Sequence, residues 1–309
     1  MRGQRPAELV VGSVQLGLPY GIANRTGKPA RATALRLVKR AADAGVAVFD
    51  TARAYGDAED RLGEALEGRS VRTITKLSPL SELPPDASSE AARAAVESSI
   101  EHSLAALRRS RLDCVLLHRA SHLTACRGAI WDRLKRYVDA GTIASLGVSV
   151  QSPSEARQAL ADSSVAHLQL PFNLLDRRWH EAGVVTQIRA RPTVTVHARS
   201  VFLQGVLCAD DISVWPAVPG CDPISISIWL NDWVHACERK NAADLCLAYV
   251  RAQDWIDGVV VGMETEAQLE ANLSLAVRAP LRADQCAKID ASRPAVPEQL
   301  LNPAHWPRR

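Results

Sequence analysis

Short apolar runs of the kind that form buried strands alternate with longer amphipathic segments along the whole chain. Val96, Ile100, Leu104 and Leu107, for example, recur at the spacing of one helical face. Such alternation is typical of a parallel β-sheet covered by α-helices. The eight predicted strands lie at residues 9–11, 46–49, 73–75, 114–117, 145–148, 167–170, 193–196 and 258–261.

Eight strands with helices between most neighbours fit a (β/α)8 barrel, or TIM barrel, in an α/β chain of 309 residues. The predicted helices lie at about residues 33–44, 62–66, 96–107, 131–138, 155–160, 181–189, 226–237, 242–252 and 266–273. No compositional break or short-period repeat divides the chain, so we expect a single domain over residues 1–309. From about residue 292, prolines such as Pro294 and Pro297 exclude a regular helix, and we expect this tail to lie across the barrel or to fray.

The charge balance argues against a protein that binds polyanions. Lys and Arg number 37 against 34 Asp and Glu, a formal net charge of +3, and no block of five or six basic residues occurs. We therefore expect neither nucleic acid nor membrane as a partner. No stretch approaches the roughly 18 consecutive apolar residues of a membrane span, and the first residues lack the apolar region of a signal peptide. A cytoplasmic protein is expected.

The seven cysteines are scattered and include no C-x-x-C motif, so they predict reduced thiols rather than a disulfide framework. A metal site built from His118, His122 and Cys126 is not expected, because their spacing fits no class of zinc site.

Candidate chemistry gathers where the predicted strands end. Asp50, Lys76 and His118 each end a predicted strand, and Tyr55 lies in the loop after the second one. In a barrel of this kind the C-terminal strand ends and the loops after them form the active face. Each residue alone is more simply explained by helix capping, solvation or packing. Together they predict a carboxylate, an ammonium group, a phenol and an imidazole near one point.

The segment from Asp50 to Gly56, with Glu59 three residues later, resembles the signature of the aldo/keto reductase superfamily. Further motifs follow in the order typical of that family, at residues 74–76, 113–118, 147–149, 169–173, 200–205 and 262–272. The strength of the resemblance, which covers about residues 9–275, lies in this ordered set. It implies a (β/α)8 barrel, a nicotinamide cofactor and reduction of a carbonyl group.

For that chemistry an acid must protonate the carbonyl oxygen as hydride reaches the carbon, and we expect Tyr55 to be this acid. The ammonium group of Lys76 would stabilise the phenolate, and Asp50 would supply the counter-charge that a buried lysine needs. We expect His118, as a neutral imidazole, to donate a hydrogen bond to the carbonyl oxygen. Glu59 is expected to favour the N-terminus of the following helix rather than to take part in chemistry.

No G-x-G-x-x-G motif occurs, so a Rossmann domain is not the source of cofactor binding. By resemblance, residues at the ends of the fifth and sixth strands would bind the nicotinamide carboxamide, residues after the seventh strand the pyrophosphate, and residues after the eighth strand the adenosine. Residues at the end of the first strand would approach the cofactor as well. The residues that the resemblance implies are Gly12, Ser13, Ser149, Gln169, Arg199, Ser200, Phe202, Gln204, Gly205, Gly262, Gln268 and Asn272.

Three positions depart from the family pattern. Val150 stands where many relatives have Asn, and Arg199 where an aromatic ring often stacks on the nicotinamide. Gln268 stands where many relatives have an Arg that pairs with the 2′-phosphate of NADP. The resemblance still favours NADP as the cofactor, with NAD as the alternative.

The substrate is expected to be a small aldehyde or ketone, such as a sugar or a natural-product carbonyl compound. Loops with Trp179, Trp215 and Trp306 predict aromatic walls for it, and Arg119 with His122 could meet a polar or acidic group. Two alternatives stay open. One is a Schiff-base aldolase or lyase with Lys76 as nucleophile, and the other is a nicotinamide-binding regulatory subunit with little turnover. The sequence identifies no protein partner.

Overall fold

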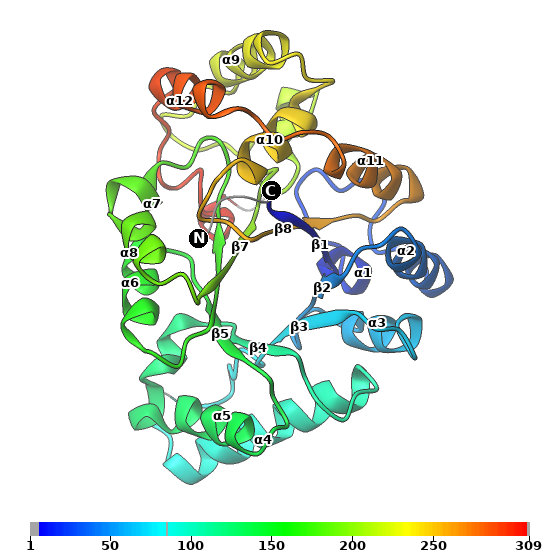
Figure 1. Ribbon diagram of the computed structural model, residues 1–309, viewed down its shortest axis with the longest axis vertical. Coiled ribbons are helices and arrows are strands. Elements are labelled where there is room, and N and C mark those ends of the chain that lie inside the picture. The colour runs from blue at the N-terminus through cyan, green and yellow to red at the C-terminus, as the bar shows by residue number, and fades with distance from the viewer. Residues whose placement is uncertain (1–5, 85, 308–309) are drawn as a thin grey trace.

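The computed structural model describes residues 6–84 and 86–307. Its eight parallel strands follow one another around a closed barrel, viewed along its axis in Figure 1. The strands are β1 (Glu8–Gly12), β2 (Val48–Asp50), β3 (Arg72–Lys76), β4 (Cys114–Leu117), β5 (Leu146–Ser149), β6 (His167–Pro171), β7 (Thr195–Arg199) and β8 (Gly258–Gly262). The predicted (β/α)8 architecture is confirmed.

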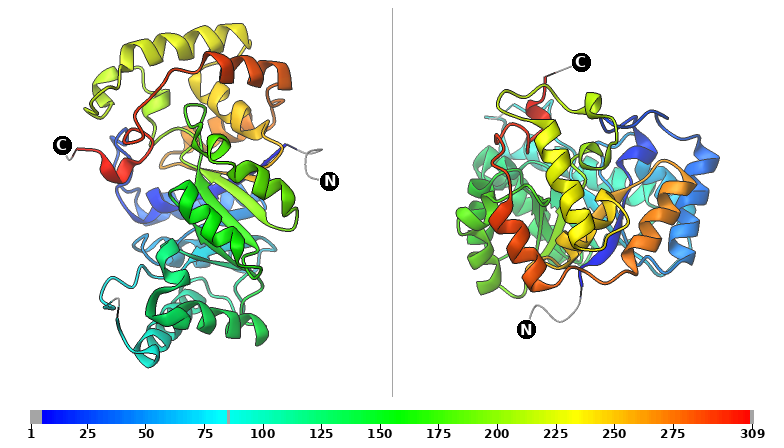
Figure 2. Two further views of the ribbon diagram at one scale, coloured as in Figure 1. Left: turned by 90° about the vertical axis from the view of Figure 1, so that its left-hand side faces the viewer. Right: turned by 90° about the horizontal axis from the view of Figure 1, so that it is seen from above.

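Helices surround the barrel, and Figures 1 and 2 show that α9 and α12 lie outside α10. The α-helices are α1 (Val14–Gly17), α2 (Arg31–Asp43), α3 (Ala58–Ala65), α4 (Ser89–Ala106), α5 (Ala129–Asp139), α6 (Pro153–Ala161), α7 (Arg178–Glu181), α8 (Val184–Ala190), α9 (Pro223–Ala236), α10 (Ala242–Arg251), α11 (Glu266–Ala276) and α12 (Ala283–Ser292). Short 3-10 helices are η1 (Ala120–Leu123), η2 (Ala125–Gly128), η3 (Val206–Cys208), η4 (Ile212–Val214) and η5 (Pro303–His305).

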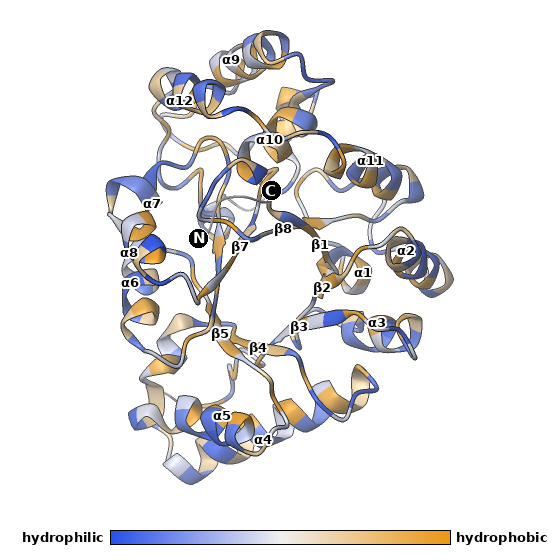
Figure 3. Ribbon diagram, in the orientation of Figure 1, coloured by the Kyte–Doolittle hydropathy of each residue, from blue (hydrophilic) through white to orange (hydrophobic). Residues whose placement is uncertain are grey.

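The strands are apolar on both faces because one face lines the barrel and the other meets the helices. A small cluster of buried side chains forms the inner core: Val10, Val48, Ile74, Cys114 and Leu116. A much larger cluster fills the layer between strands and helices, where Figure 3 shows apolar helix faces turned toward the barrel. The barrel closes where β1 pairs in register with β8 along the whole strand.

Several elements differ from the sequence predictions: the short helices α1 and α7 were not predicted, and α3 and α4 begin earlier than expected. Strand β7 covers Thr195–Arg199 rather than residues 193–196, because His197 and Arg199 interrupt the apolar run that marked the strand. Helix α12 was not predicted. Its only fully buried side chain is Ile289, so the helix shows little of the apolar periodicity that identifies helices in a sequence.

The proline-spaced tail packs on the barrel. Leu300 and Leu301 are buried. Gln151 Nε2 donates to Asn302 Oδ1 at 3.1 Å, and Arg178 of α7 pairs with Glu298 at 3.3 Å. The tail therefore lies against the loops that follow β5 and β6.

None of the seven cysteines, which all lie in the described ranges, forms a disulfide. Within residues 6–84 and 86–307 no helix is long and apolar enough to cross a membrane. In the same ranges no cluster of His, Cys, Asp and Glu side chains could hold a metal ion.

Two imidazoles meet inside the barrel, where His167 of β6 and His197 of β7 lie 4.3 Å apart between ring centroids. Gly258 of β8 makes room for them, since a Cβ there would lie 2.7 Å from His197 Nε2. Neither ring nitrogen of His197 has a hydrogen-bond partner within the described chain. Burial lowers the pKa of His197 to about 3, and the charges of Arg72 and Lys76 act in the same direction. His197 is therefore neutral in the folded protein at neutral pH.

We expect His197 to make the fold sensitive to acid. Between pH 3 and the ordinary histidine pKa of about 6.5, the unfolded chain binds a proton that folded His197 does not, so the free energy of unfolding rises with pH. On acidification this one group lowers the free energy of unfolding by up to about 1.4 kcal/mol per pH unit. Urea unfolding at pH 7, 5 and 4 measures the slope. In His197→Gln the slope should be smaller, and equal slopes in the two proteins would contradict the assignment.

Candidate active site

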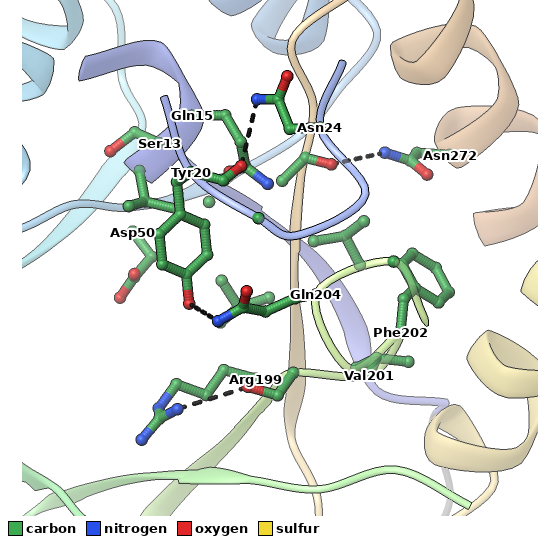
Figure 4. Close-up of a pocket in the computed structure, with 18 of the residues that line it drawn as sticks. Ser13, Gln15, Tyr20, Asn24, Asp50, Arg199, Val201, Phe202, Gln204 and Asn272 are labelled. Carbon is green, nitrogen blue, oxygen red and sulfur yellow. Dashed lines mark hydrogen bonds between the residues drawn. The ribbon is translucent and has the colours of Figure 1, made fainter. Parts of the chain in front are cut away.

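A cavity of about 940 Å³ opens at the C-terminal ends of the strands. Figure 4 shows side chains around it from the first strand end, the loop after α1, and the turn after β7. Three of the predicted catalytic residues line it, namely Asp50, Tyr55 and His118. Most residues predicted from the resemblance to bind a cofactor line it too: Gly12, Ser13, Ser149, Arg199, Ser200, Phe202, Gln204, Gly205, Gly262, Gln268 and Asn272.

Lys76 lies at the end of β3 beneath the cavity, with 1% of its surface exposed. Its Nζ donates to both carboxylate oxygens of Asp50, at 2.7 and 2.9 Å, and to the carbonyl oxygen of Thr51 at 2.9 Å. Burial by itself would lower the pKa of Lys76, but Asp50 and the Tyr55 hydroxyl raise it above its ordinary value. Lys76 is therefore a fixed cation, and Asp50 neutralises it.

Gln169 of β6 is fully buried and belongs to the same network rather than to the cavity wall. Its Nε2 donates to Asp50 Oδ2 at 2.7 Å. Asp50 thus accepts from an amide as well as from the ammonium group. Gln169, which the resemblance assigns to the nicotinamide carboxamide, thus lies next to the Lys76–Asp50 pair, beneath the surface of the cavity.

Tyr55 lies over the charged pair, with Lys76 Nζ 5.0 Å from the centroid of its ring. The loop that carries Tyr55 packs closely against α1. A Cβ on Gly17 would lie 1.8 Å from the carbonyl oxygen of Tyr55, and Gly56 has a φ of +58°. Glycine is required at both positions, because a side chain at either one would move the backbone of Tyr55.

His118 follows β4, and its ring lies edge-on to Tyr55 with 5.8 Å between centroids. Burial lowers the pKa of His118 to about 3, and the neighbouring charges of Lys76, Arg199 and Arg119 act in the same direction. The imidazole is therefore neutral at physiological pH and has one N–H to donate. Its Nδ1 is buried and has no hydrogen-bond partner in the described ranges.

The turn after β7 is bent through several left-handed residues. Ser200, Leu203 and Gln204 have φ values of 60°, 47° and 55°, which are unusual for residues with a side chain. Strained backbone of this kind is concentrated at functional sites, and such turns can direct backbone N–H groups at an anion. Gln204 also joins the turn to the loop after α1, since its Nε2 donates to the Tyr20 hydroxyl at 3.3 Å, as Figure 4 shows.

Glu264 and Gln268 lie at the start of α11, on the wall of the same cavity. Gln268 Nε2 donates to Glu264 Oε1 at 3.0 Å, and Gln268 Oε1 accepts from the backbone N–H of Glu264 at 2.8 Å. Asn272, one helical turn further, donates to the carbonyl oxygen of Gly262 at 3.3 Å. This wall presents amides and one carboxylate, and residues 262–272 contain no Lys or Arg.

Arg199 lines the cavity at the end of β7 but is held by neighbouring groups. Its guanidinium donates to Gln151 Oε1 at 2.7 Å and to the carbonyl oxygen of Val150 at 3.2 Å. The two departures from the family pattern at Val150 and Arg199 therefore lie in contact with each other. Gln151 in turn joins Arg199 to Asn302 of the tail.

The predicted aromatic walls are wrong. Trp179 is fully buried and Trp215 is 6% exposed, both in the outer core, and Trp306 packs on the same core. Their apolar character marked core residues rather than a ligand site. The aromatic residues that line the cavity are Tyr20, Tyr55 and Phe202.

Several residues of the cavity wall were missed by sequence reasoning: Gln15, Tyr20, Asn24, Gln151, Lys240 and Asn241. They lie in α1 or in irregular loops, where no periodicity indicates which side chains face inward. For Tyr20 and Asn24, the aromatic and amide side chains within a glycine-containing loop were the only signal.

Unpartnered polar atoms point to a polar ligand in this cavity. Ser13 Oγ, Gln15 Oε1 and His118 Nδ1 are buried, and none has a hydrogen-bond partner within the described chain. Gln169 Oε1, which lies beneath the wall, is likewise buried without a hydrogen-bond partner in the described ranges. Buried polar groups are almost always hydrogen-bonded, so the three atoms at the cavity wall fit a ligand with several donors and acceptors. A nicotinamide dinucleotide has that character.

Comparison with known proteins agrees with this geometry. The sequence profile of the aldo/keto reductase family matches residues 8–294. The aldo-keto reductase YhdN of Bacillus subtilis (strain 168) is 27% identical over 181 residues, covering 57% of this chain and 52% of that relative. The chain thus spans about half the length of this curated relative.

Solved structures show the same fold. The holo form of the aldo-keto reductase AKR11C1 from Bacillus halodurans matches with a TM-score of 0.78 and 21% identity over 98% of both chains. Its apo form matches with a TM-score of 0.72 and 21% identity, over 93% of this chain and 95% of that one. Because the family profile extends over nearly the whole barrel, this chain belongs to the aldo/keto reductase family, a family of NAD(P)H-dependent enzymes.

Proposed function

We propose that the protein reduces an aldehyde or ketone to an alcohol with NAD(P)H. The observation that carries the proposal is the arrangement of Tyr55 over the Lys76–Asp50 pair, with neutral His118 beside it in one cavity. An acid, a group that stabilises its conjugate base, and a donor for the carbonyl oxygen thus surround one point. Hydride transfer to a carbonyl needs these three functions.

When bound, the reduced nicotinamide supplies the hydride that forms the new C–H bond as the carbonyl π bond breaks. The electron pair of that bond moves to the carbonyl oxygen, and Tyr55 Oη gives this oxygen its proton. Lys76 stabilises the resulting phenolate, and its charge is already present because Asp50 holds it. His118 donates its N–H to the same oxygen and fixes the direction of the carbonyl group.

The residues that would hold the cofactor follow the length of the cavity. Ser13, whose backbone N–H donates to the carbonyl oxygen of Asp50, and Ser149 lie toward the catalytic end and suit the carboxamide, whereas Gln169 lies beneath the cavity wall. The left-handed turn at residues 200–205 suits the pyrophosphate, and residues 262–272 suit the adenosine. The unpartnered oxygens of Ser13 and Gln15, both on the cavity wall, support this assignment.

A Schiff-base mechanism is disfavoured by the state of Lys76. A nucleophilic lysine must be neutral, whereas the pKa of Lys76 is raised and its Nζ makes three hydrogen bonds to oxygen atoms. If the protein is instead a regulatory subunit, it would bind a nicotinamide in the same cavity but would reduce no carbonyl compound. A sugar-like or other polar carbonyl compound is the proposed substrate, since Ser121, Gln151 and Arg119 line the cavity. A cytoplasmic location stays a prediction.

Titration of protein fluorescence with NADPH and with NADH, followed by a panel of aldehydes and ketones, tests this function. We expect saturable binding of a reduced nicotinamide and turnover of at least one polar carbonyl compound. If neither cofactor binds, the proposal fails. If one binds and no carbonyl is reduced, the regulatory alternative replaces it.

The same titration tests the choice between NADP and NAD. The family resemblance favours NADP, but residues 262–272 offer Gln268 and Glu264 to a 2′-phosphate and no cation. We expect Gln268→Arg to bind NADPH about 10- to 100-fold more tightly, since a charge-assisted bond to phosphate is worth about 1.5–3 kcal/mol. Its affinity for NADH should change little, and Gln268→Leu serves as the control without added charge. Equal affinities for NADPH in wild type and Gln268→Arg would contradict this placement of the adenosine.

A further inference from the structure

Glu59 is a buried carboxylate outside the catalytic group. It lies in the first turn of α3, four residues after Tyr55, and only 1% of its surface is exposed. A favourable effect on the helix N-terminus does not require burial, since such effects operate at exposed positions. Removing a carboxylate from water is costly unless its oxygens are fully partnered. The partners of Glu59 therefore indicate its role.

Both oxygens of Glu59 are occupied. Oε2 accepts from Arg53 Nη1 at 2.7 Å. Oε1 accepts from Thr75 Oγ1 at 2.5 Å and from Ser103 Oγ at 2.8 Å. The carboxylate thus joins the loop that carries Tyr55, the strand that carries Lys76, and helix α4.

The positions of the partners along the chain connect this cluster to the catalytic residues. Arg53 precedes Tyr55 by two residues, and its backbone N–H donates to the carbonyl oxygen of Lys76 at 3.2 Å. Thr75 precedes Lys76 in β3. Because successive strand side chains point to opposite faces, Thr75 reaches outward to Glu59 while Lys76 reaches inward to Asp50. The end of β3 is therefore fixed from both sides.

We propose that Glu59 is a positioning residue that sets the placement of Tyr55 relative to Lys76, with Arg53 as its link to the loop. This inference rests on the proposed function, in which Tyr55 is the acid. Proton transfer needs heavy atoms within about 2.6–3.2 Å, and a displacement of about 1 Å can cost 100-fold in rate. The loop is held by its packing on Gly17 of α1 and by the ion pair of Arg53 with Glu59. Loss of Glu59 removes the second of these contacts.

Three variants test the proposal. Glu59→Gln keeps the shape and removes the charge that holds Arg53. Arg53→Met removes the other member of the same ion pair. Because the Arg53 side chain is 26% exposed, this variant should fold even if Glu59→Gln folds poorly. Glu64→Gln is the matched control, because Glu64 lies in the same helix and pairs with Arg31 at the surface.

In both test variants we expect kcat to fall about 10- to 100-fold, with the cofactor Kd and substrate KM within about threefold of wild type. The solvent deuterium isotope effect on kcat should increase, because proton transfer becomes slower. Glu64→Gln should match wild type in all these quantities. Folded test variants with wild-type kcat, or with kcat lowered only in proportion to cofactor binding, would overturn the proposal.

A readout independent of turnover separates this proposal from the proposed function. The chain has four tyrosines, so ¹³C-tyrosine NMR spectra are simple, and the resonance absent from Tyr55→Phe identifies Tyr55. Glu59→Gln and Arg53→Met should shift this resonance, and Glu64→Gln should not. An unmoved Tyr55 resonance refutes the positioning role even if the wild type reduces no carbonyl, and absence of cofactor binding refutes the proposed function alone.

Discussion

Tyr55→Phe is expected to lower kcat about 10²- to 10⁴-fold while leaving cofactor affinity nearly unchanged, because it removes only the hydroxyl that protonates the carbonyl oxygen. Phe fills the same space, so the packing on Gly17 and the loop geometry should persist. Steady-state kinetics with the best carbonyl substrate and a fluorescence titration of the cofactor measure the two effects separately.

Two other tyrosines provide the comparison. Tyr137 lies on α5, where its ring meets Arg133, and Tyr137→Phe should behave as wild type. Tyr20 is the rival acid, since it lines the same cavity. Burial raises the pKa of Tyr20, which makes it a poorer acid. A large loss of kcat in Tyr20→Phe, with little loss in Tyr55→Phe, would show that Tyr20 and not Tyr55 is the acid.

Lys76→Met is expected to remove both activity and stability. It leaves Asp50 as an uncompensated buried carboxylate that still accepts from Gln169 Nε2. Breaking a buried ion pair from one side costs about 3–5 kcal/mol of unfolding free energy. The loss of the charge that stabilises the Tyr55 phenolate should also lower kcat by about 100-fold or more. Urea unfolding and steady-state kinetics measure these two losses.

The double variant Lys76→Met/Asp50→Asn separates the loss of stability from the loss of activity. Removing the second charge should restore most of the stability, because no unpaired ion is left in the barrel. Activity should stay low, since the ammonium group that faces Tyr55 is still missing. If stability is not restored, the loss in Lys76→Met comes from packing rather than from charge. Recovery of activity would show that Lys76 is dispensable for the acid.

The barrel and the gathering of the candidate catalytic residues at its C-terminal end could be predicted, because polar residues follow directly after apolar strands. Asp50, Lys76 and His118 each follow an apolar strand, and the barrel topology brings such strand ends together. Tyr55 was added by its place in the loop and by the family resemblance. The structure brings Tyr55, Lys76 and His118 together. Lys76 Nζ lies 5.0 Å from the centroid of the Tyr55 ring, and the centroids of the Tyr55 and His118 rings are 5.8 Å apart.

Residues whose surroundings depend on other segments could not be predicted. Glu59 looked like an ordinary first-turn carboxylate, since nothing in its neighbourhood along the chain reveals Thr75 and Ser103. Trp179 and Trp215 looked like ligand walls for the same reason, because an aromatic side chain in a loop gives no sign of whether it faces a cavity or the core. Tertiary contacts decide both questions.

Transfer of deuterium in a single turnover tests the central claim most directly. The protein is loaded with reduced nicotinamide that carries deuterium at both C4 positions and mixed with a carbonyl substrate, and the alcohol is analysed by mass spectrometry. We expect the label on the carbinol carbon with the wild type, and none in the same time with Tyr55→Phe. An unlabelled alcohol from the wild type, or equally fast labelling by Tyr55→Phe, would contradict hydride delivery to a carbonyl protonated by Tyr55.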